Sequence, residues 1–259
     1  MILDFIAIPT GWLMKLFYNL VLPLDTKYLS AYSISLILIT LVIKFLLLPL
    51  TLKQTKSMKR MQELNPKIKE LQERYGKDPQ TFQRKQMELY KEEGYNPMAG
   101  CLPMLIQLPL IVTFFNVIQK PVKYIFGGDQ AAYDLINKSF LWIKDLAFSE
   151  GHILSNEIVN GVGMGFNLPF IGIAIPILAA ISAYTTYLTT KMTSASQPAV
   201  VDEQQKSTQN MMNIMMPIMI FFMSIKFPSG LALYWVVGNI FQLVQQWLVL
   251  NSSKKIKEQ

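Results

Sequence analysis

Long stretches without a charged residue constrain this chain more than any other feature. Four runs contain no Lys, Arg, Asp or Glu over 19 to 33 residues, namely 94–119, 158–190, 207–225 and 227–253. A fifth run, 28–52, is interrupted only by Lys44. A helix needs about 20 apolar residues to cross a bilayer core of about 30 Å. The runs therefore predict an all-α membrane protein with five transmembrane helices and exclude a soluble globular domain.

The order of apolar and polar stretches predicts the domain organisation. In chain order the segments are an N-terminal amphipathic interfacial helix (1–28), the first span (29–52), a cytoplasmic helical hairpin (53–95), the second span (96–119), an extracytoplasmic loop (120–167), the third span (168–190), a cytoplasmic loop (191–209), the fourth span (210–226), the fifth span (227–250) and a basic tail (251–259). The interfacial helix is expected because Trp12, Leu13, Leu16, Phe17 and Leu20 fall on one helical face.

The hairpin is predicted from hydrophobic periodicity and capping signals. Apolar residues recur every three or four positions from Met58 to Tyr75, which indicates an amphipathic helix. Asn65-Pro66 is expected to interrupt and bend it, because proline lacks the N–H that an interior turn needs. Asp78 followed by Pro79 is typical of the start of a second helix, with Asp78 as its N-cap.

The distribution of positive charge predicts the orientation. Of the 24 Lys and Arg residues, eleven lie in 53–95, and the loop around 191–210 and the tail bring that side of the membrane to 16. The opposite side holds seven. Positive residues accumulate in cytoplasmic loops, so the hairpin and the C-terminus are expected inside and the N-terminus outside. The net charge of +7 is thus explained without nucleic acid, and no DNA partner is expected.

The chemistry of an enzyme is missing from the predicted spans. None of them contains Asp or Glu, which argues against a proton relay or an intramembrane aspartyl protease. One histidine and one cysteine cannot build a metal centre, and no glycine-rich phosphate loop is present. The sequence therefore predicts no catalytic residue, no metal, no cofactor and no nucleotide hydrolysis.

Lys44 is the one charge in the interior of a predicted span. It precedes the cytoplasmic end of that span by eight residues, which places it about 12 Å deep. Such a charge is costly unless it meets water or a partner. One explanation is a water-filled cavity, and the other is a side chain that extends to the interface. Because the stem of lysine is short for this depth and no span offers an acid, we favour the cavity.

Three other features leave two explanations open. Gln107 in the second span is either a cavity residue or an interhelical hydrogen-bond partner. Methionines spaced along the fourth span form either a pliable surface for substrate helices or ordinary packing. The hairpin, with basic residues Lys56, Lys59, Arg60, Arg74, Arg84 and Lys85, is either a docking arm or a solvated connector. Its length favours docking, since a plain connection needs only a few residues.

Several short motifs resemble the YidC-type membrane protein insertases, in the short form of Gram-positive bacteria. The matching stretches are Leu47–Leu50 with Lys53-Gln54, Asn65–Lys67, Tyr75–Asp78, Tyr95–Pro97, Cys101–Pro103, Gln107–Pro109, Phe227–Trp235, Asn239 and Gln245-Gln246. The resemblance extends over nearly the whole chain. It implies a five-helix core around a hydrophilic groove that opens to the cytoplasm and the lipid. A positive residue of the first span, usually arginine, lies in that groove, and Lys44 occupies the matching position.

The resemblance implies a protein that inserts and helps to fold membrane proteins from the bacterial plasma membrane. Its partners would be newly made membrane proteins and lipids, with the ribosome and the general secretion channel as further candidates. We assign the groove to Lys44, Gln107, Thr186, Trp235, Asn239 and Gln242, the face along which substrate helices slide to Met212, Met215, Met216 and Met219, and docking to the six basic hairpin residues. The alternatives are a small channel or uniporter, and an assembly chaperone without translocation activity.

Overall fold

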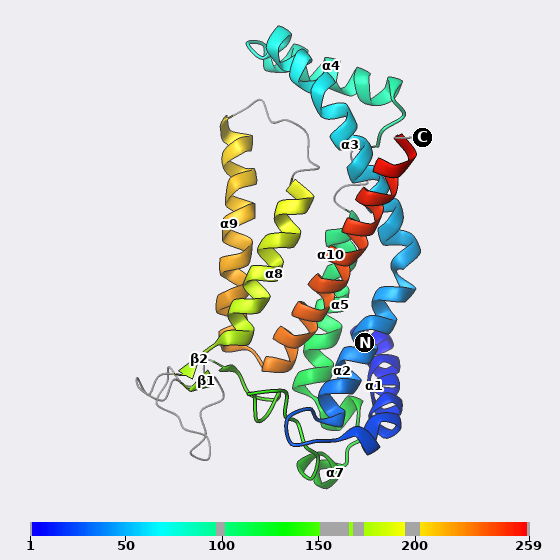
Figure 1. Ribbon diagram of the computed structural model, residues 1–259, viewed down its shortest axis with the longest axis vertical. Helices are drawn as coiled ribbons and strands as arrows, with labels where there is room; N and C mark the ends of the chain where they lie inside the picture. The colour runs from blue at the N-terminus through cyan, green and yellow to red at the C-terminus, as the bar shows by residue number, and fades with distance from the viewer. Residues whose placement is uncertain (1, 97–101, 151–165, 168–173, 195–202, 258–259) are drawn as a thin grey trace. The chain divides into compact units, whose positions relative to one another are not determined.

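The computed structural model describes residues 2–96, 102–150, 166–167, 174–194 and 203–257 (Figure 1). Within these ranges, side chains are not described at 2–3, 102–106, 166–167, 174–175, 203–212 and 250–257. The regular elements are helices, apart from the short antiparallel strands β1 (Phe166–Asn167) and β2 (Ala174–Ile175). The predicted all-α class is therefore correct in outline, with this strand pair as an addition.

The α-helices differ widely in length, from four residues to 29. In chain order, the helices are α1 (Ile2–Val21), the 3-10 helix η1 (Leu22–Leu24), α2 (Ala31–Leu46), α3 (Leu48–Tyr75), α4 (Pro79–Glu92), α5 (Leu102–Gln119), α6 (Pro121–Tyr124), α7 (Gln130–Asp134), α8 (Ile177–Ser194), α9 (Glu203–Lys226) and α10 (Ser229–Lys257). The chain forms two compact units. The first is Met1–Leu46, Gln107–Thr186 and Pro217–Phe241, and the second is Leu47–Ile106, Tyr187–Met216 and Gln242–Gln259.

The core of the first unit is apolar and fully enclosed. Tyr32 and Leu36 of α2, Phe114 of α5 and Tyr234 of α10 are at most 2% exposed. The rings of Phe114 and Tyr234 stack with their centroids 4.0 Å apart. Helix α1 approaches α6 closely at Gly11, where a Cβ atom would lie 2.2 Å from the Tyr124 carbonyl oxygen. Only glycine permits this contact, so α1 is held against the same core.

The second unit contains the helical hairpin, in which α4 lies against α3 (Figure 1). The buried side chains between the two helices are Met61, Leu64, Ile68, Phe82 and Tyr90, with Leu71, Tyr75, Leu89 and Tyr95 packed around them. Asp78 caps α4, since its carboxylate accepts hydrogen bonds from the backbone N–H groups of Gln80 and Thr81. The predicted N-cap is thereby confirmed, and so is the predicted apolar face of α3.

One local expectation about a helix break is wrong. The chain was expected to be interrupted at Asn65-Pro66, yet α3 continues through Pro66 to Tyr75, because residues on both sides of the proline pack into the same hairpin core. Within the predicted first span, 29–52, α2 ends at Leu46 and α3 starts at Leu48. Pro49 lies in the first turn of α3, where its missing N–H is tolerated.

Length and hydropathy single out fewer membrane spans than the charge-poor runs predict. Among the described residues, Asp4–Leu24 qualifies as one helix, and Ala31–Leu46 with Leu48–Tyr75 qualifies only if the two helices count as one broken span. Gln107–Gln119 and Asn213–Lys226 are apolar but shorter. The predicted third span starts outside the described residues, and its helix α8 begins only at Ile177, after β2.

Helix α1 does not have a single apolar face. Trp12, Leu16 and Leu20 are exposed, whereas Leu13 and Phe17 pack against the core of the first unit. The five residues expected on one face are therefore divided between the protein interior and its surface. The helix carries apolar side chains toward both.

Candidate functional site

Lys44 lies near the end of α2 and faces α10. It is half-buried, and its Cε and Nζ atoms lie 3.1 Å and 3.4 Å from the place where a Cβ of Gly238 would be. Next to this contact, the rings of Phe45 and Phe241 meet edge to face at 5.1 Å, which fixes α2 against α10. Within the described part of the chain, the Lys44 ammonium has neither a carboxylate nor a hydrogen-bond acceptor. It is a partly enclosed positive charge that the protein does not neutralise there.

Gln107 lies on α5 and contacts α10 one turn before Gly238. Its side-chain amide donates a hydrogen bond of 3.1 Å to the hydroxyl of Tyr234. Tyr234 is 2% exposed and also stacks on Phe114, so its phenol is held in one place. Gln107 is half-buried. The amide therefore acts as an interhelical partner, while its assignment to the groove stays a prediction.

Asn239 follows Gly238 and links α10 to α8. Its side-chain amide donates to the hydroxyls of Thr186 at 2.8 Å and Thr185 at 3.2 Å. Thr186 in turn donates to the carbonyl oxygen of Ser182, and the Ser182 hydroxyl lies 2.9 Å from that of Ser224 on α9. A buried polar chain thus joins three helices. Ser182 and Thr185 thus serve as interhelical hydrogen-bond partners.

The predicted groove residues are therefore only partly brought together. Lys44 meets α10 at Gly238, Thr186 bonds to Asn239, and Gln107 bonds to Tyr234 on the same helix. Trp235 is half-buried on α10. Gln242 is also half-buried but belongs to the second unit.

The sequence prediction missed Gly238 altogether. A glycine inside a long apolar helix, flanked by an asparagine, is a recognisable signal, because isolated glycines in such helices often mark a close approach. It was overlooked because the residue that approaches is Lys44, on a distant helix. Gly238 completes the site: it is where α10 leaves room for the lysine head.

The methionine face of α9 is exposed only in part. Met215 and Met219 are 54% and 52% exposed, whereas Met216 is half-buried. The side chain of Met212 lies outside the described residues. Ile218 and Phe222 are as exposed as the methionines. The open surface of α9 is therefore generally apolar and not made of methionine alone.

The basic residues of the hairpin differ in how free they are. Arg60 donates a hydrogen bond to the backbone carbonyl of Glu93, and Lys85 forms an ion pair of 2.7 Å with Glu88. Four of the six lie on the hairpin surface with open side chains, namely Lys56, Arg60, Arg74 and Arg84, whereas Lys59 and Lys85 are half-buried. The hairpin thus presents a basic surface on an independently packed core.

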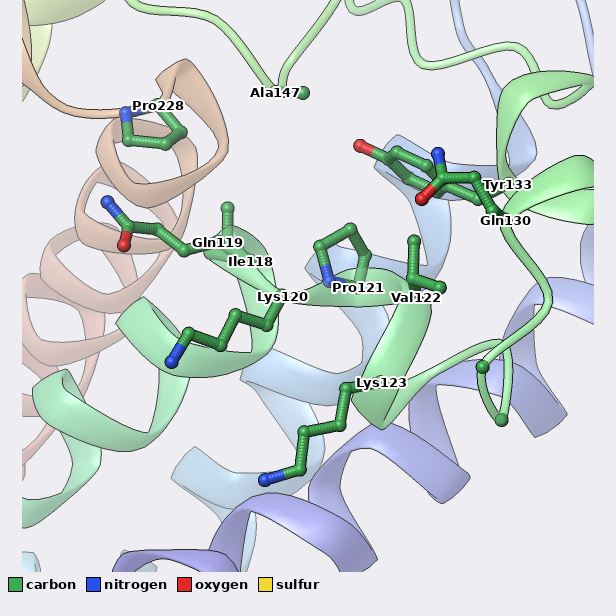
Figure 2. Close-up of a pocket in the computed structure, with 12 residues that line it drawn as sticks. Ile118, Gln119, Lys120, Pro121, Val122, Lys123, Gln130, Tyr133, Ala147 and Pro228 are labelled. Carbon is green, nitrogen blue, oxygen red and sulfur yellow. The ribbon is translucent and has the colours of Figure 1, made fainter.

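A separate hollow of about 880 Å³ lies where α5 ends and α6 and α7 begin. Figure 2 shows Gln119 and Pro228 on one side of it and Gln130 and Tyr133 on the other. Lys120 and Lys123 also line it, and Lys123 pairs with Asp4 at 3.0 Å. None of its lining residues belongs to the predicted groove. In the described ranges, no three His, Cys, Asp or Glu residues gather as a metal site.

These features define a class of protein before any comparison is made. Four stretches of the sequence carry no charge, polar residues of α8 and α10 bond to one another, and Lys44 of α2 has no carboxylate partner in the described ranges. Polar and ionisable groups are kept in this way in helical membrane proteins with a functional interior. The class is a multi-helix membrane protein.

Comparison with known proteins identifies the family. Residues 24–257 match the family described as 60Kd inner membrane protein, and the chain belongs to this family of YidC membrane protein insertases. The chain is 38% identical to the membrane protein insertase YidC of Clostridium perfringens over 232 residues, covering 88% of this chain and 83% of the relative. It is 35% identical to YidC 1 of Listeria monocytogenes, covering 98% and 74%, and 32% identical to YidC of Caldanaerobacter subterraneus, covering 89% and 90%.

The family relationship establishes the general function. The chain is a membrane-located insertase of the short type found in Gram-positive relatives, and it is not an enzyme. The predicted resemblance to this family is confirmed. Its substrates are membrane proteins.

Proposed function

We propose that the five charge-poor segments are membrane spans, with the N-terminus outside and the hairpin and C-terminus in the cytoplasm. The charge distribution supports this orientation, because 16 basic residues would lie inside and seven outside. The breaks that shorten the helices lie at Leu47 and before Ile177. A span with such breaks is tolerated when protein surrounds the irregular backbone.

Helix α1 lies in the outer interface in this arrangement. Both of its charges are directed to the protein, since Asp4 accepts from Lys123 and the Lys15 ammonium lies 4.1 Å from the centre of the Phe126 ring. Phe5, Trp12 and Leu20 are each more than 60% exposed. The outward surface of α1 is therefore apolar and suits contact with lipid.

The polar residues around Lys44 form the substrate groove. The observation that carries this proposal is the half-buried Lys44 ammonium, which has room at Gly238 and no acidic partner in the described ranges. A charge in such a place stays charged only if water or a ligand reaches it. Acidic groups in the outer segment of a substrate would supply the missing partner.

Insertion follows from these properties without nucleotide hydrolysis. A polar segment cannot cross lipid alone because its backbone and charges lose water. A wet groove lets that segment enter part of the way, and Lys44 attracts it when it is acidic. The apolar substrate helix then slides along the open surface of α9 with Met215 and Met219, while partition into lipid drives the transfer. The basic hairpin docks the ribosome or another targeting partner.

The test is reconstitution of the purified protein alone in lipid vesicles. A single-span substrate with an acidic outer tail is added, and protease protection of the tail is scored. We expect protection above empty vesicles, retention with Lys44→Arg, and loss with Lys44→Glu. Lys144→Glu is the matched control, since it makes the same charge change at an exposed residue of the outer loop. Equal protection by Lys44→Glu and wild type would contradict the role of the charge.

A folded protein that protects no tail above empty vesicles would instead favour an assembly chaperone without translocation activity. Selective, saturable ion flux through the same vesicles would favour a small channel. Crosslinking of the tail to the groove before protection appears would favour the insertase over both.

A further inference from the structure

The strongest unassigned feature of the molecule is the contact between Gly238 and the head of Lys44. Outside its own helix, only two atoms lie within 4 Å of the position of a Gly238 Cβ among the described residues, and both belong to Lys44: Cε at 3.1 Å and Nζ at 3.4 Å. A methyl group at residue 238 would therefore press on the lysine head and on nothing else described there. Distances of this size are tighter than ordinary carbon contacts.

Other contacts of the region hold this part of α10 against α2, α5 and α8. The Phe45 and Phe241 rings pack at 5.1 Å beside the lysine, and Phe114 stacks on Tyr234 one turn before Gly238. Asn239 ties the same stretch of α10 to Thr186 on α8. The flexible end of Lys44 is the part that would give way.

We propose that Gly238 is a positioning residue for the Lys44 ammonium and thereby sets how strongly the insertase draws in acidic segments. The missing side chain at residue 238 lets the ammonium rest against the backbone of α10. Any larger residue displaces the ammonium from this place and covers part of it. This inference rests on the proposed function of Lys44 as the charge that attracts the substrate.

The stability of the protein separates this role from ordinary packing. Glycine is the least favourable residue after proline in a helix interior, so Gly238→Ala should stabilise α10. We expect the unfolding temperature of Gly238→Ala in detergent to rise by about 2–4 °C. A glycine that merely allows helix packing would show the opposite, because the added methyl group would push the helices apart.

The experiment compares wild type, Gly238→Ala, Gly238→Ser, Lys44→Ala and the double variant Gly238→Ala/Lys44→Ala in the vesicle assay. Two substrates are used that differ only in the outer tail, which is acidic in one and neutral in the other. We expect Gly238→Ala and Gly238→Ser to lower protection of the acidic tail by roughly three- to tenfold, the range of one polar contact in a membrane bundle. Protection of the neutral tail should not change, and the double variant should equal Lys44→Ala.

The outcomes distinguish this inference from the proposed function. If Lys44→Ala protects the acidic tail as well as wild type, the proposed function fails, and the role of Gly238 fails with it. If Lys44→Ala is defective but Gly238→Ala and Gly238→Ser are not, only the positioning role is overturned. Three other results would show that Gly238 serves packing and would also overturn the positioning role. They are an equal loss of protection for both tails, a further loss of protection in the double variant, and a lower unfolding temperature in both glycine variants.

Discussion

At the scale of single residues, the bond between Gln107 and Tyr234 offers a clean test of what holds the site together. Tyr234→Phe removes the hydroxyl group that accepts the hydrogen bond but keeps the ring that stacks on Phe114. The half-buried amide of Gln107 then loses its partner, and we expect the free energy of unfolding to fall by about 1 kcal/mol. The measurement is thermal unfolding in detergent.

A double-mutant cycle with Gln107→Leu shows whether that loss belongs to the bond. In the leucine background, Tyr234→Phe should have almost no effect, with a coupling energy of about 0.6–1.7 kcal/mol. Tyr184→Phe is the matched control, because Tyr184 is 62% exposed. If Tyr234→Phe lowered the free energy of unfolding as much in the Gln107→Leu background as in wild type, the effect would belong to the surroundings of the ring and not to the hydrogen bond.

Residues of the site differ in how far sequence alone could predict them. Lys44 stands out because a charge inside an apolar run is rare and expensive. Its neighbour Gly238 is hidden, because their contact joins two helices far apart in the chain. Asn239 was predicted as a groove residue, yet its amide bonds to Thr185 and Thr186. A polar residue in a span carries no sign of whether it faces a cavity or another helix.

At the scale of elements, two helix starts show the same contrast. Asp78 caps α4 within its own turn, so the local pattern predicted it. Helix α8 is capped from a distant loop: Glu150 accepts hydrogen bonds from the backbone N–H groups of Leu178 at 3.1 Å and Ala179 at 2.8 Å, and from Trp142 Nε1 at 3.1 Å. The Glu150 cap could not be predicted from the local sequence, because Glu150 lies 28 residues before Leu178.

The Glu150 cap predicts a pH dependence of stability. Burial raises the pKa of this carboxyl above its ordinary value, although the three donated hydrogen bonds act in the opposite direction. The folded protein therefore holds the proton more tightly than the unfolded chain does. The stability from this group is complete below the ordinary glutamate pKa of about 4.3 and is lost as the pH rises through the raised value.

Glu150→Gln tests this dependence, since glutamine resembles the protonated acid at every pH. We expect the unfolding temperature of wild type, relative to that of Glu150→Gln, to fall as the pH rises from 4 through the raised pKa. Each unit by which folding raises the pKa corresponds to about 1.4 kcal/mol in the free energy of unfolding. Glu92→Gln, at an exposed site of the hairpin, should parallel wild type. Parallel curves for Glu150→Gln and wild type would show that Glu150 does not titrate differently on folding.

At the scale of the whole molecule, the family could be predicted from the sequence, whereas the ends of the helices could not. Charge-poor runs can be read directly from the sequence, because charged residues are costly in lipid and are therefore rare in membrane spans. Helix ends depend on packing instead: α2 stops at Leu46 inside an apolar run, and α3 continues through Pro66 inside a polar one. Neither the length of a run nor a proline alone determines where a helix ends.

The predicted topology can be tested by labelling single cysteines in intact cells. The only natural cysteine is Cys101, so Cys101→Ser provides the background. Lys27→Cys and Lys144→Cys should react with a membrane-impermeant maleimide before lysis, because both lie in exposed connections that the positive-inside rule places outside. Lys77→Cys, in the exposed turn between α3 and α4, should react only after lysis. The opposite orientation would be indicated if Lys77→Cys reacted in intact cells or if Lys144→Cys reacted only after lysis. The groove would then open on the side away from a substrate made in the cytoplasm.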